Sequence, residues 1–321
     1  MTTGRWAPSS PWLRAAAGGA LSGLLFASSV WLPPLGLLVC LASPLPIALT
    51  AWGGGTRAAT LGGAVGAALS AALTGPVGAG VYAGQFALGG AALGLMLRAG
   101  RPPEAAVGAF AALLVAGFWF VLGTLALQAG KNPLDFVAET VRQSAEQARE
   151  LLARGNGEAE GTAALRQWAD QTAATMLRVF PGLLVSFGML AGWANALGLR
   201  RVLRGRGEDL SAWNTWRAPE GWIWVLIGSG LVAALGPGAV GTTGLNVFVP
   251  TVVVYFLQGL AVIDHLFQAR GFPRPLRALT YALLFLQLPI ALFVAAVGAF
   301  DLWADFRARW SPPPPTKSVE T

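Results

Sequence analysis

The chain has 321 residues, of which 55% are hydrophobic and only 12% are charged. Ordinary soluble domains carry about 25% charged residues, so this composition excludes a soluble globular protein, whose surface needs more charge. The apolar residues occur in runs long enough to cross the bilayer as helices, which takes ~20 residues each. We therefore predict an all-α, polytopic helical membrane protein.

The charge and the reactive residues exclude further classes. The formal net charge is +7 and the isoelectric point is about 10.7. The basic residues form short clusters between apolar runs, which indicates topology signals and no nucleic-acid partner. Cys40 is the single cysteine and His265 the single histidine, so the chain has neither a disulfide framework nor the convergent ligands of a metal site. We expect no cofactor, no metal and no catalytic residue.

A short cytoplasmic segment, residues 1–14, precedes a first membrane bundle, residues 15–129. Pro33 and Pro34 lead directly from the first apolar run into the next, so we interpret the first run as a span and not as a cleaved signal peptide. Glycine and alanine recur there at four-residue steps, which predicts closely packed helix backbones. The five predicted spans of this bundle are residues 15–32, 35–52, 58–75, 78–97 and 105–128.

Residues 130–173 form a long, charged connection. Asn132 is the predicted N-cap and Pro133 the first residue of a helix that ends at Gly155, with apolar residues at three- and four-residue steps. A second short helix, residues 162–168, runs into the next span. We predict an extracytoplasmic amphipathic helical hairpin, which either rests on the membrane surface or forms a lid over an outward-facing cavity.

A second bundle, residues 174–300, precedes a proline-rich tail, residues 301–321. The total is about nine spans, and the positive-inside bias places the basic connections and the N-terminus in the cytoplasm, within the inner (plasma) membrane. An eight-span arrangement with a cytoplasmic tail is the alternative, because Arg307 and Arg309 follow the last span. The four predicted spans of this bundle are residues 176–197, 221–238, 246–268 and 278–299.

Polar side chains in the predicted spans suggest a binding cavity. Amides are costly against lipid and should face the interior of the bundle, where several of them would line a neutral, outward-facing cavity for a small polar or aromatic molecule. For any single amide, a hydrogen bond that pins a neighbouring helix is the competing interpretation. The candidate ligand-binding residues are Gln85, Arg178, Asn195, Asn246 and Gln258.

Three places are candidates for docking a partner. Small residues on the first span either pack within the chain or meet a second membrane protein, and the basic connection after residue 200 either binds a cytoplasmic partner or anchors in headgroups. An Asp-His pair near the end of the eighth span either couples the protein to a cytoplasmic partner or is a solvated pair at the end of a helix. The residues are Ala15, Gly19 and Gly23; Arg204, Trp213 and Trp216; and Asp264 with His265.

Two C-terminal stretches, GLNVFVPTVVVYFLQGLAVIDHLFQARGFPRPLRALTYALLF and VGAFDLWADFR, carry a family pattern. Its elements are Gly244 to Asn246, Gln258 to Ala261, Gly271, Pro273, Arg277, Gly298, Asp301 and Arg307, with Pro44 and Pro46 upstream. The pattern resembles the YybS-like family of bacterial polytopic membrane proteins, a domain of unknown function. That family is distantly similar to the S components of energy-coupling-factor transporters, which capture a ligand and rely on a separate transmembrane and ATPase module. More spans and the long hairpin distinguish this chain from them.

The residues and the resemblance together predict a small-ligand-binding membrane component of a transport system without catalysis of its own. Its expected partners are the lipid bilayer, a small-molecule ligand and, as the resemblance implies, a transmembrane and ATPase module. The alternative is a membrane interaction or scaffold protein that docks cytoplasmic partners through the basic, tryptophan-rich connection.

Overall fold

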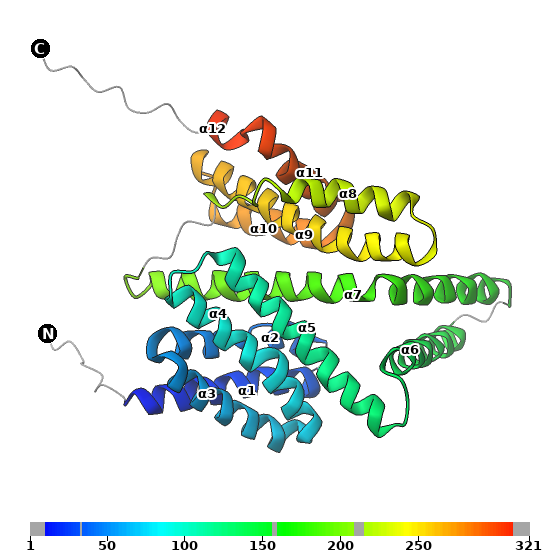
Figure 1. Cartoon of the computed structure of the whole chain (residues 1–321), viewed down its shortest axis with the longest axis horizontal. Coiled ribbons are helices and arrows are strands. Elements are labelled where there is room, and N and C mark those ends of the chain that lie inside the picture. The colour runs from blue at the N-terminus through cyan, green and yellow to red at the C-terminus, as the bar shows by residue number, and fades with distance from the viewer. Residues whose placement is uncertain (1–9, 33, 156–158, 209–214, 311–321) are drawn as a thin grey trace, which may run out of the picture. The chain divides into compact units, whose positions relative to one another are not determined.

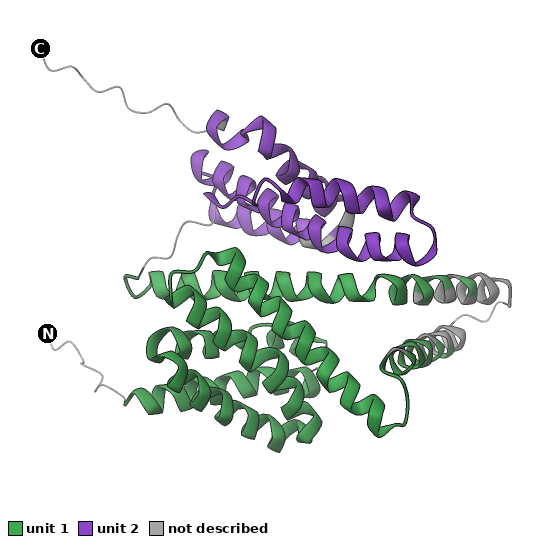
Figure 2. Cartoon of the chain, viewed as in Figure 1, with its two compact units in different colours: residues 1–210 green, residues 211–321 purple. Residues whose placement is uncertain are grey.

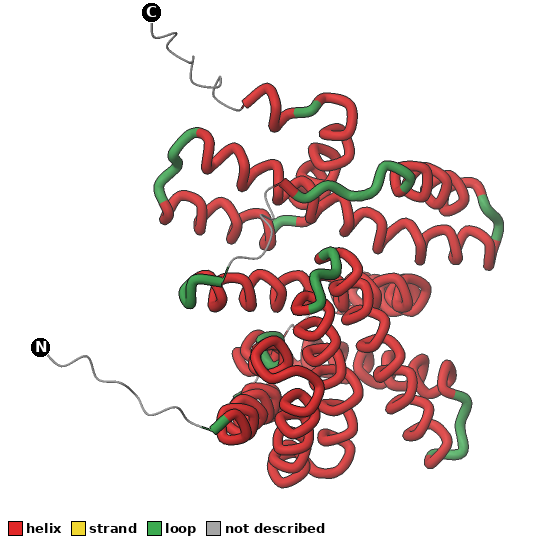
Figure 3. Tube along the Cα trace, turned by 60° about the vertical axis from the view of Figure 1, so that its left-hand side comes forward, coloured by secondary structure: helices red, strands yellow, loops and turns green. Residues whose placement is uncertain are grey.

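The computed structural model describes residues 10–32, 34–155, 159–208 and 215–310, and its regular secondary structure there is entirely helical (Figures 1 and 3). The all-α prediction is therefore confirmed. Two compact units divide the chain, residues 1–210 and residues 211–321 (Figure 2). Unit 1 contains helices α1 to α7, and unit 2 contains α8 to α12.

Helix α1 (Pro11–Trp31) packs along α3 (Pro44–Val81) through facing glycines. A methyl group on Gly23 would lie 2.8 Å from the carbonyl oxygen of Gly66, and a methyl group on Gly19 would overlap the backbone of Gly62. Such contacts are possible only without a Cβ atom, and they let helix backbones approach closely in the absence of a hydrophobic drive. The predicted close packing is therefore found within the chain.

Two glycines reverse the chain inside α3. Gly55 and Gly75 have φ angles of 68° and 81°, in the left-handed region that L side chains rarely adopt. A methyl group on Gly62 would lie 3.4 Å from the side chains of both Ile47 and Thr50, although a straight helix would place Gly62 about 18 Å from Thr50. The segments before and after Gly55 therefore lie side by side.

A short helix, α2 (Leu35–Cys40), ends before the prolines that begin α3. Pro44 occupies the first turn of α3, where its missing N–H needs no partner. The buried hydroxyl of Ser22 on α1 donates a hydrogen bond of 2.6 Å to the carbonyl oxygen of Ser43. The break in the predicted second span is thus tied to the first helix.

A short π-helix lies between α3 and α4. The π-helix η1 (Tyr82–Ala87) continues into α4 (Leu88–Arg98). Tyr82 is fully buried, donates a hydrogen bond of 2.8 Å to Ser22, and packs its ring against Phe26. Phe86 packs against the same phenylalanine, so the aromatic core of unit 1 lies where η1 meets α1.

Helix α5 (Pro103–Gln128) is followed by α6 (Pro133–Gly155), whose two ends lie at the predicted residues. Helix α7 (Ala159–Arg204) then runs without a break through the predicted short helix and the sixth span. It packs on α5, where a methyl group on Gly188 would lie 3.0 Å from the Cα atom of Ala111. Because of this packing α7 belongs to unit 1, whereas we had assigned residues 174–300 to one second bundle.

In unit 2, α8 (Trp222–Leu235) turns back into α9 (Gly238–Ala269), and Gly244 packs against the backbone of α8. The turn after α9 uses a left-handed Gly271, with φ of 63°. The guanidinium of Arg277 donates hydrogen bonds of 2.9 Å to the carbonyl oxygens of Phe267 and Phe272. These bonds join the start of α10 to the last turn of α9 and to the turn that follows it.

The predicted ninth span is two helices, α10 (Arg274–Leu286) and α11 (Leu288–Ala304), bent by 106°. Pro289 lies in the first turn of α11, and a proline cannot continue the ladder of an incoming helix. Gly298 of α11 and Gly259 of α9 face each other's helices so closely that a methyl group on either would overlap backbone. A short helix, α12 (Phe306–Trp310), follows.

By length and composition, five helices in the described residues are apolar enough to cross a membrane, or six if α10 and α11 form one bent span. One of the five is the run Leu35–Arg98, which Gly55 and Gly75 interrupt, and α8 has only 14 residues. The helical membrane class is therefore established, but the count of nine spans is not confirmed.

The predicted docking residues on the first span are buried within unit 1. Ala15, Gly19 and Gly23 are all buried, and the two glycines contact α3. A partner would have to separate α1 from α3 to reach them. The small-residue face therefore packs within unit 1, and its use in docking a partner stays a prediction.

The glycine contact yields a prediction about stability. Replacing Gly19 by Ala should lower the free energy of unfolding by about 1–3 kcal/mol, because the added methyl group overlaps backbone that cannot move independently. Thermal unfolding of the detergent-purified protein measures the effect. Gly108→Ala on α5 is the matched control, since nothing lies within 4 Å of its added methyl group. Equal melting temperatures for the two variants would contradict the packing described here.

Candidate functional site

Unit 1 contains a cavity of about 440 Å³ between α1 and the first segment of α3. Volumes of about 300–1,000 Å³ are typical of small-molecule sites. The side chains of Leu21, Leu25, Leu45 and Leu49 line much of its wall. Two charged side chains also line it: Arg14 from α1 and Arg206 from the residues that follow α7.

Hydrogen bonds hold the end of α7 beside α3. The amide of Asn195 donates hydrogen bonds of 2.8 Å to the carbonyl oxygens of Leu41 and Ala191. Beyond the helix, the indole N–H of Trp52 donates to the carboxylate of Glu208 at 2.5 Å. Arg206 lies between these two ties in the chain, so its position over the cavity depends on them.

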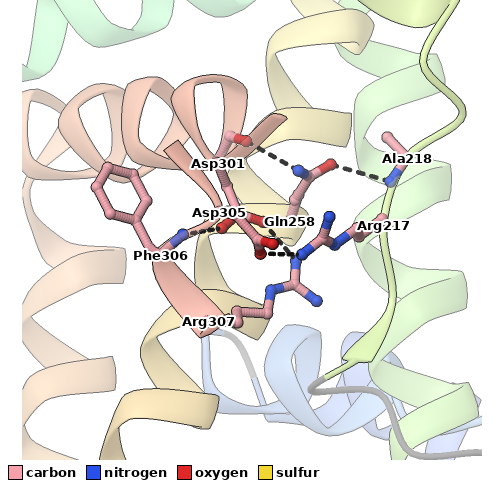
Figure 4. Close-up of polar contacts among 8 residues, drawn as sticks. Arg217, Ala218, Gln258, Asp301, Asp305, Phe306 and Arg307 are labelled. Carbon is pink, nitrogen blue, oxygen red and sulfur yellow. Dashed lines mark hydrogen bonds and ion pairs between the residues drawn. The ribbon is translucent and has the colours of Figure 1, made fainter. Parts of the chain in front are cut away.

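Unit 2 contains a buried ion pair at the end of α11 (Figure 4). The Nη2 atom of Arg307 lies 3.0 Å from the Oδ2 atom of Asp301, and the two residues are 5% and 0% exposed. The other carboxylate oxygen of Asp301 accepts a hydrogen bond of 3.1 Å from the backbone N–H of Phe306. Burial lowers the pKa of the Arg307 guanidinium, while the Asp301 carboxylate acts in the opposite direction.

Gln258 joins three segments of unit 2 next to this pair (Figure 4). Its side chain is 1% exposed. The amide nitrogen donates a hydrogen bond of 2.9 Å to the carbonyl oxygen of Gly298, and the amide oxygen accepts one of 2.9 Å from the backbone N–H of Ala218. The residue before Ala218, Arg217, forms an ion pair with Asp305. The hydrogen bond from Arg217 holds the pKa of the Asp305 carboxyl below its usual range.

The structure divides the predicted ligand-binding residues between the two units. Gln85 and Arg178 lie in unit 1 with Asn195, and Asn246 lies in unit 2 with Gln258. Asn195 and Gln258 use their amides to join helices, and Asn246 donates to the carbonyl oxygen of Thr242 at 2.9 Å. None of the five lines the 440 Å³ cavity. Their role in binding a ligand stays a prediction.

The predicted docking residues near helix ends are also dispersed. Arg204 is exposed at the end of α7 and Trp216 is partly buried, while Trp213 lies outside the described residues. The Asp264 carboxylate accepts hydrogen bonds from Gln268 at 2.7 Å and from the Tyr281 hydroxyl at 3.3 Å. His265 is its partly buried neighbour. Asp264 therefore links α9 to α10, and its use in docking stays a prediction.

Sequence reasoning missed the arginines of the cavity. Arg14 was interpreted as a topology signal and Arg206 as part of the basic connection after residue 200, and the two are separated by about three fifths of the chain. Their proximity depends on how α7 packs along α3, which no local pattern reveals. The pattern that carried the family resemblance was more informative, because Gln258, Gly298, Asp301 and Arg307 come together in the structure. Within the described residues, no group of three or more His, Cys, Asp or Glu could hold a metal.

The apolar helices and their glycine contacts define an integral, helical membrane protein. A family model described as "Predicted membrane protein (DUF2232)" matches residues 20–302. The chain therefore belongs to this family of membrane proteins. No curated protein and no solved structure matches it. The match names neither the YybS-like group nor the S components, so those two likenesses stay predictions.

The polar cluster of unit 2 allows a test of its energetic role. Asp301→Asn should lower the free energy of unfolding by about 3–5 kcal/mol, because it leaves the buried Arg307 without its counter-charge. Asp305→Asn, which breaks the exposed pair with Arg217, should remain close to wild type. Thermal unfolding measures both. The double variant D301N/R307M should be less destabilised than D301N alone, and an unfolding temperature for D301N equal to that of D305N would contradict the assignment.

Proposed function

We propose that the protein is a ligand-binding component of a membrane transport system and has no catalytic activity of its own. In this proposal it crosses the bacterial inner membrane about nine times, with its N-terminus and basic connections in the cytoplasm and the α6 hairpin outside. A separate transmembrane and ATPase module, such as the one that serves S components, supplies the energy. The ligand occupies the cavity of unit 1.

The observation that carries the proposal is the cavity itself. It has the volume of a small-molecule site, and its wall is mostly apolar with a few charged groups. That composition is typical of sites that bury a ligand and orient it with a small number of polar contacts. In the polar cluster of unit 2, the hydrogen bonds of Gln258 and Asp301 are made to backbone groups.

The position of the cavity changes one part of the expected mechanism. Pro11 and Arg14 at the start of α1, Gly53 and Gly54 at the end of the first α3 segment, and Arg206 all contribute to its lining. These residues belong to the basic connections, which the positive-inside bias places in the cytoplasm. The proposed site is thus nearer the cytoplasmic face, whereas the amide-lined cavity was expected to open outward.

A cavity-filling variant tests the proposal. Ala17 is exposed on α1 and lines the cavity, so Ala17→Phe should exclude the ligand without burying new atoms in the core. Mass spectrometry of the detergent-purified wild type should detect a retained small molecule that A17F lacks. A ligand that binds only the native state raises the melting temperature. At a free ligand concentration of one hundred times its Kd, it adds ~2.7 kcal/mol to the free energy of unfolding.

Ala112→Phe on α5 is the matched control, because Ala112 is exposed and does not line the cavity. The same purification identifies proteins that accompany the chain. An ATPase pair supports a transport role. A structural partner that is lost on changing Arg204, Trp213 and Trp216, with no small molecule retained by wild type, would favour the scaffold alternative and contradict the proposal.

A further inference from the structure

The cavity of unit 1 has a cationic end and an apolar end. Arg14 lies in the first turn of α1, near the end of the cavity that Gly53 and Gly54 line. Leu25 lines the cavity three turns further along α1, which corresponds to about 16 Å of helix rise. The site therefore changes from charged to apolar along the direction of a helix that crosses the membrane.

Among the residues that the structure describes, the two charged side chains that line the cavity are both cationic. No carboxylate is found among the described residues that line the cavity. The nearest acidic residue along the chain, Glu208, does not line the cavity, and its carboxylate accepts the hydrogen bond from Trp52. The ion pairs formed between described residues engage neither Arg14 nor Arg206. Two cations brought to one cavity repel each other unless an anion lies between them.

The apolar part is open toward the outside of the helix bundle. Ala17 and Leu21 line the cavity and are exposed on α1, and Leu21 keeps 51% of its surface accessible. An exposed apolar surface on a membrane helix lies against lipid. A chain-bearing molecule can therefore enter sideways from the leaflet without crossing a polar barrier.

We propose that this cavity binds an anionic amphiphile, with a phosphate or carboxylate head between Arg14 and Arg206 and an alkyl chain along the leucines. This assignment rests on the proposed function and narrows its ligand class. Arginine suits such a head because its guanidinium donates paired hydrogen bonds to phosphate and carboxylate oxygens. The ligand enters from the cytoplasmic leaflet, where the basic end of the protein lies.

Native mass spectrometry of the full chain, released from neutral micelles, tests the assignment. The probes are lysophosphatidylglycerol and lysophosphatidylcholine with the same acyl chain, and glycerol 3-phosphate as a headgroup without a chain. Wild type should bind the anionic lipid about tenfold or more tightly than the zwitterionic one, since a hydrogen-bonded charge pair is involved. Glycerol 3-phosphate should bind far more weakly, because it lacks the apolar part.

The variants R14Q and R206Q should each reduce binding of the anionic lipid, and R14Q/R206Q should bind both lipids equally. R57Q and R201Q are matched controls, since Arg57 and Arg201 are exposed basic residues that do not line the cavity. These controls should keep the tenfold preference. A preference that survives in R14Q/R206Q, or that R57Q and R201Q lose equally, would overturn the assignment.

The cavity-filling variant separates this inference from the proposed function. If A17F loses both lipids while R14Q/R206Q keeps the wild-type preference, the cavity binds a ligand but the two arginines do not select its charge. If A17F binds every probe as wild type does, the cavity is not a ligand site and both proposals fail. Tight binding of glycerol 3-phosphate alone would assign the site to a free anion and contradict the amphiphile.

Discussion

The close approach of α1 and α3 through glycine is the contact on which unit 1 depends. In lipid no hydrophobic drive brings helices together, so association relies on van der Waals contact at short range. Gly19 and Gly23 allow that range by facing the backbone of Gly62 and Gly66. The same helix pair bounds the cavity, since Ala17 and Gly18 of α1 line it together with Pro46 and Thr50 of α3. Packing and the proposed binding site therefore share one interface, and a change that separates the helices alters both.

Unit 2 uses hydrogen bonds where unit 1 uses mainly small residues. Gly259 and Gly298 bring α9 and α11 together, and Gln258 adds a buried amide that joins both to the segment before α8. A polar group buried without a partner is costly, so each helix is favoured in the one position that satisfies the amide. The Asp301 and Arg307 pair continues this cluster to the end of α11. Four residues of the pattern, Gln258, Gly298, Asp301 and Arg307, therefore lie in one cluster of contacts.

Basic residues of the chain fall into two groups, those that only orient the protein in the membrane and those that also line the cavity. The positive-inside bias does not distinguish the two groups. Arg57 and Arg201 are exposed basic residues near helix ends, as expected of residues that orient a membrane protein. Arg14 and Arg206 occupy the same side by that rule, but they also enter the cavity. Near Arg206, Asn195 ties α7 to Leu41 and Glu208 bonds to Trp52.

The sequence by itself determined the helical membrane class, the ends of α6 and the use of small residues for packing, because these follow from composition and from spacing within a few turns. The left-handed glycines at positions 55 and 75 fall between predicted spans or at the end of one, whereas the bend before Pro289, inside the predicted ninth span, appeared only in the structure. Tertiary structure alone decided which distant backbone groups Asn195 and Gln258 bind and which arginines reach the cavity. Those contacts join residues up to about 190 positions apart, and helical periodicity carries information only along one helix at a time.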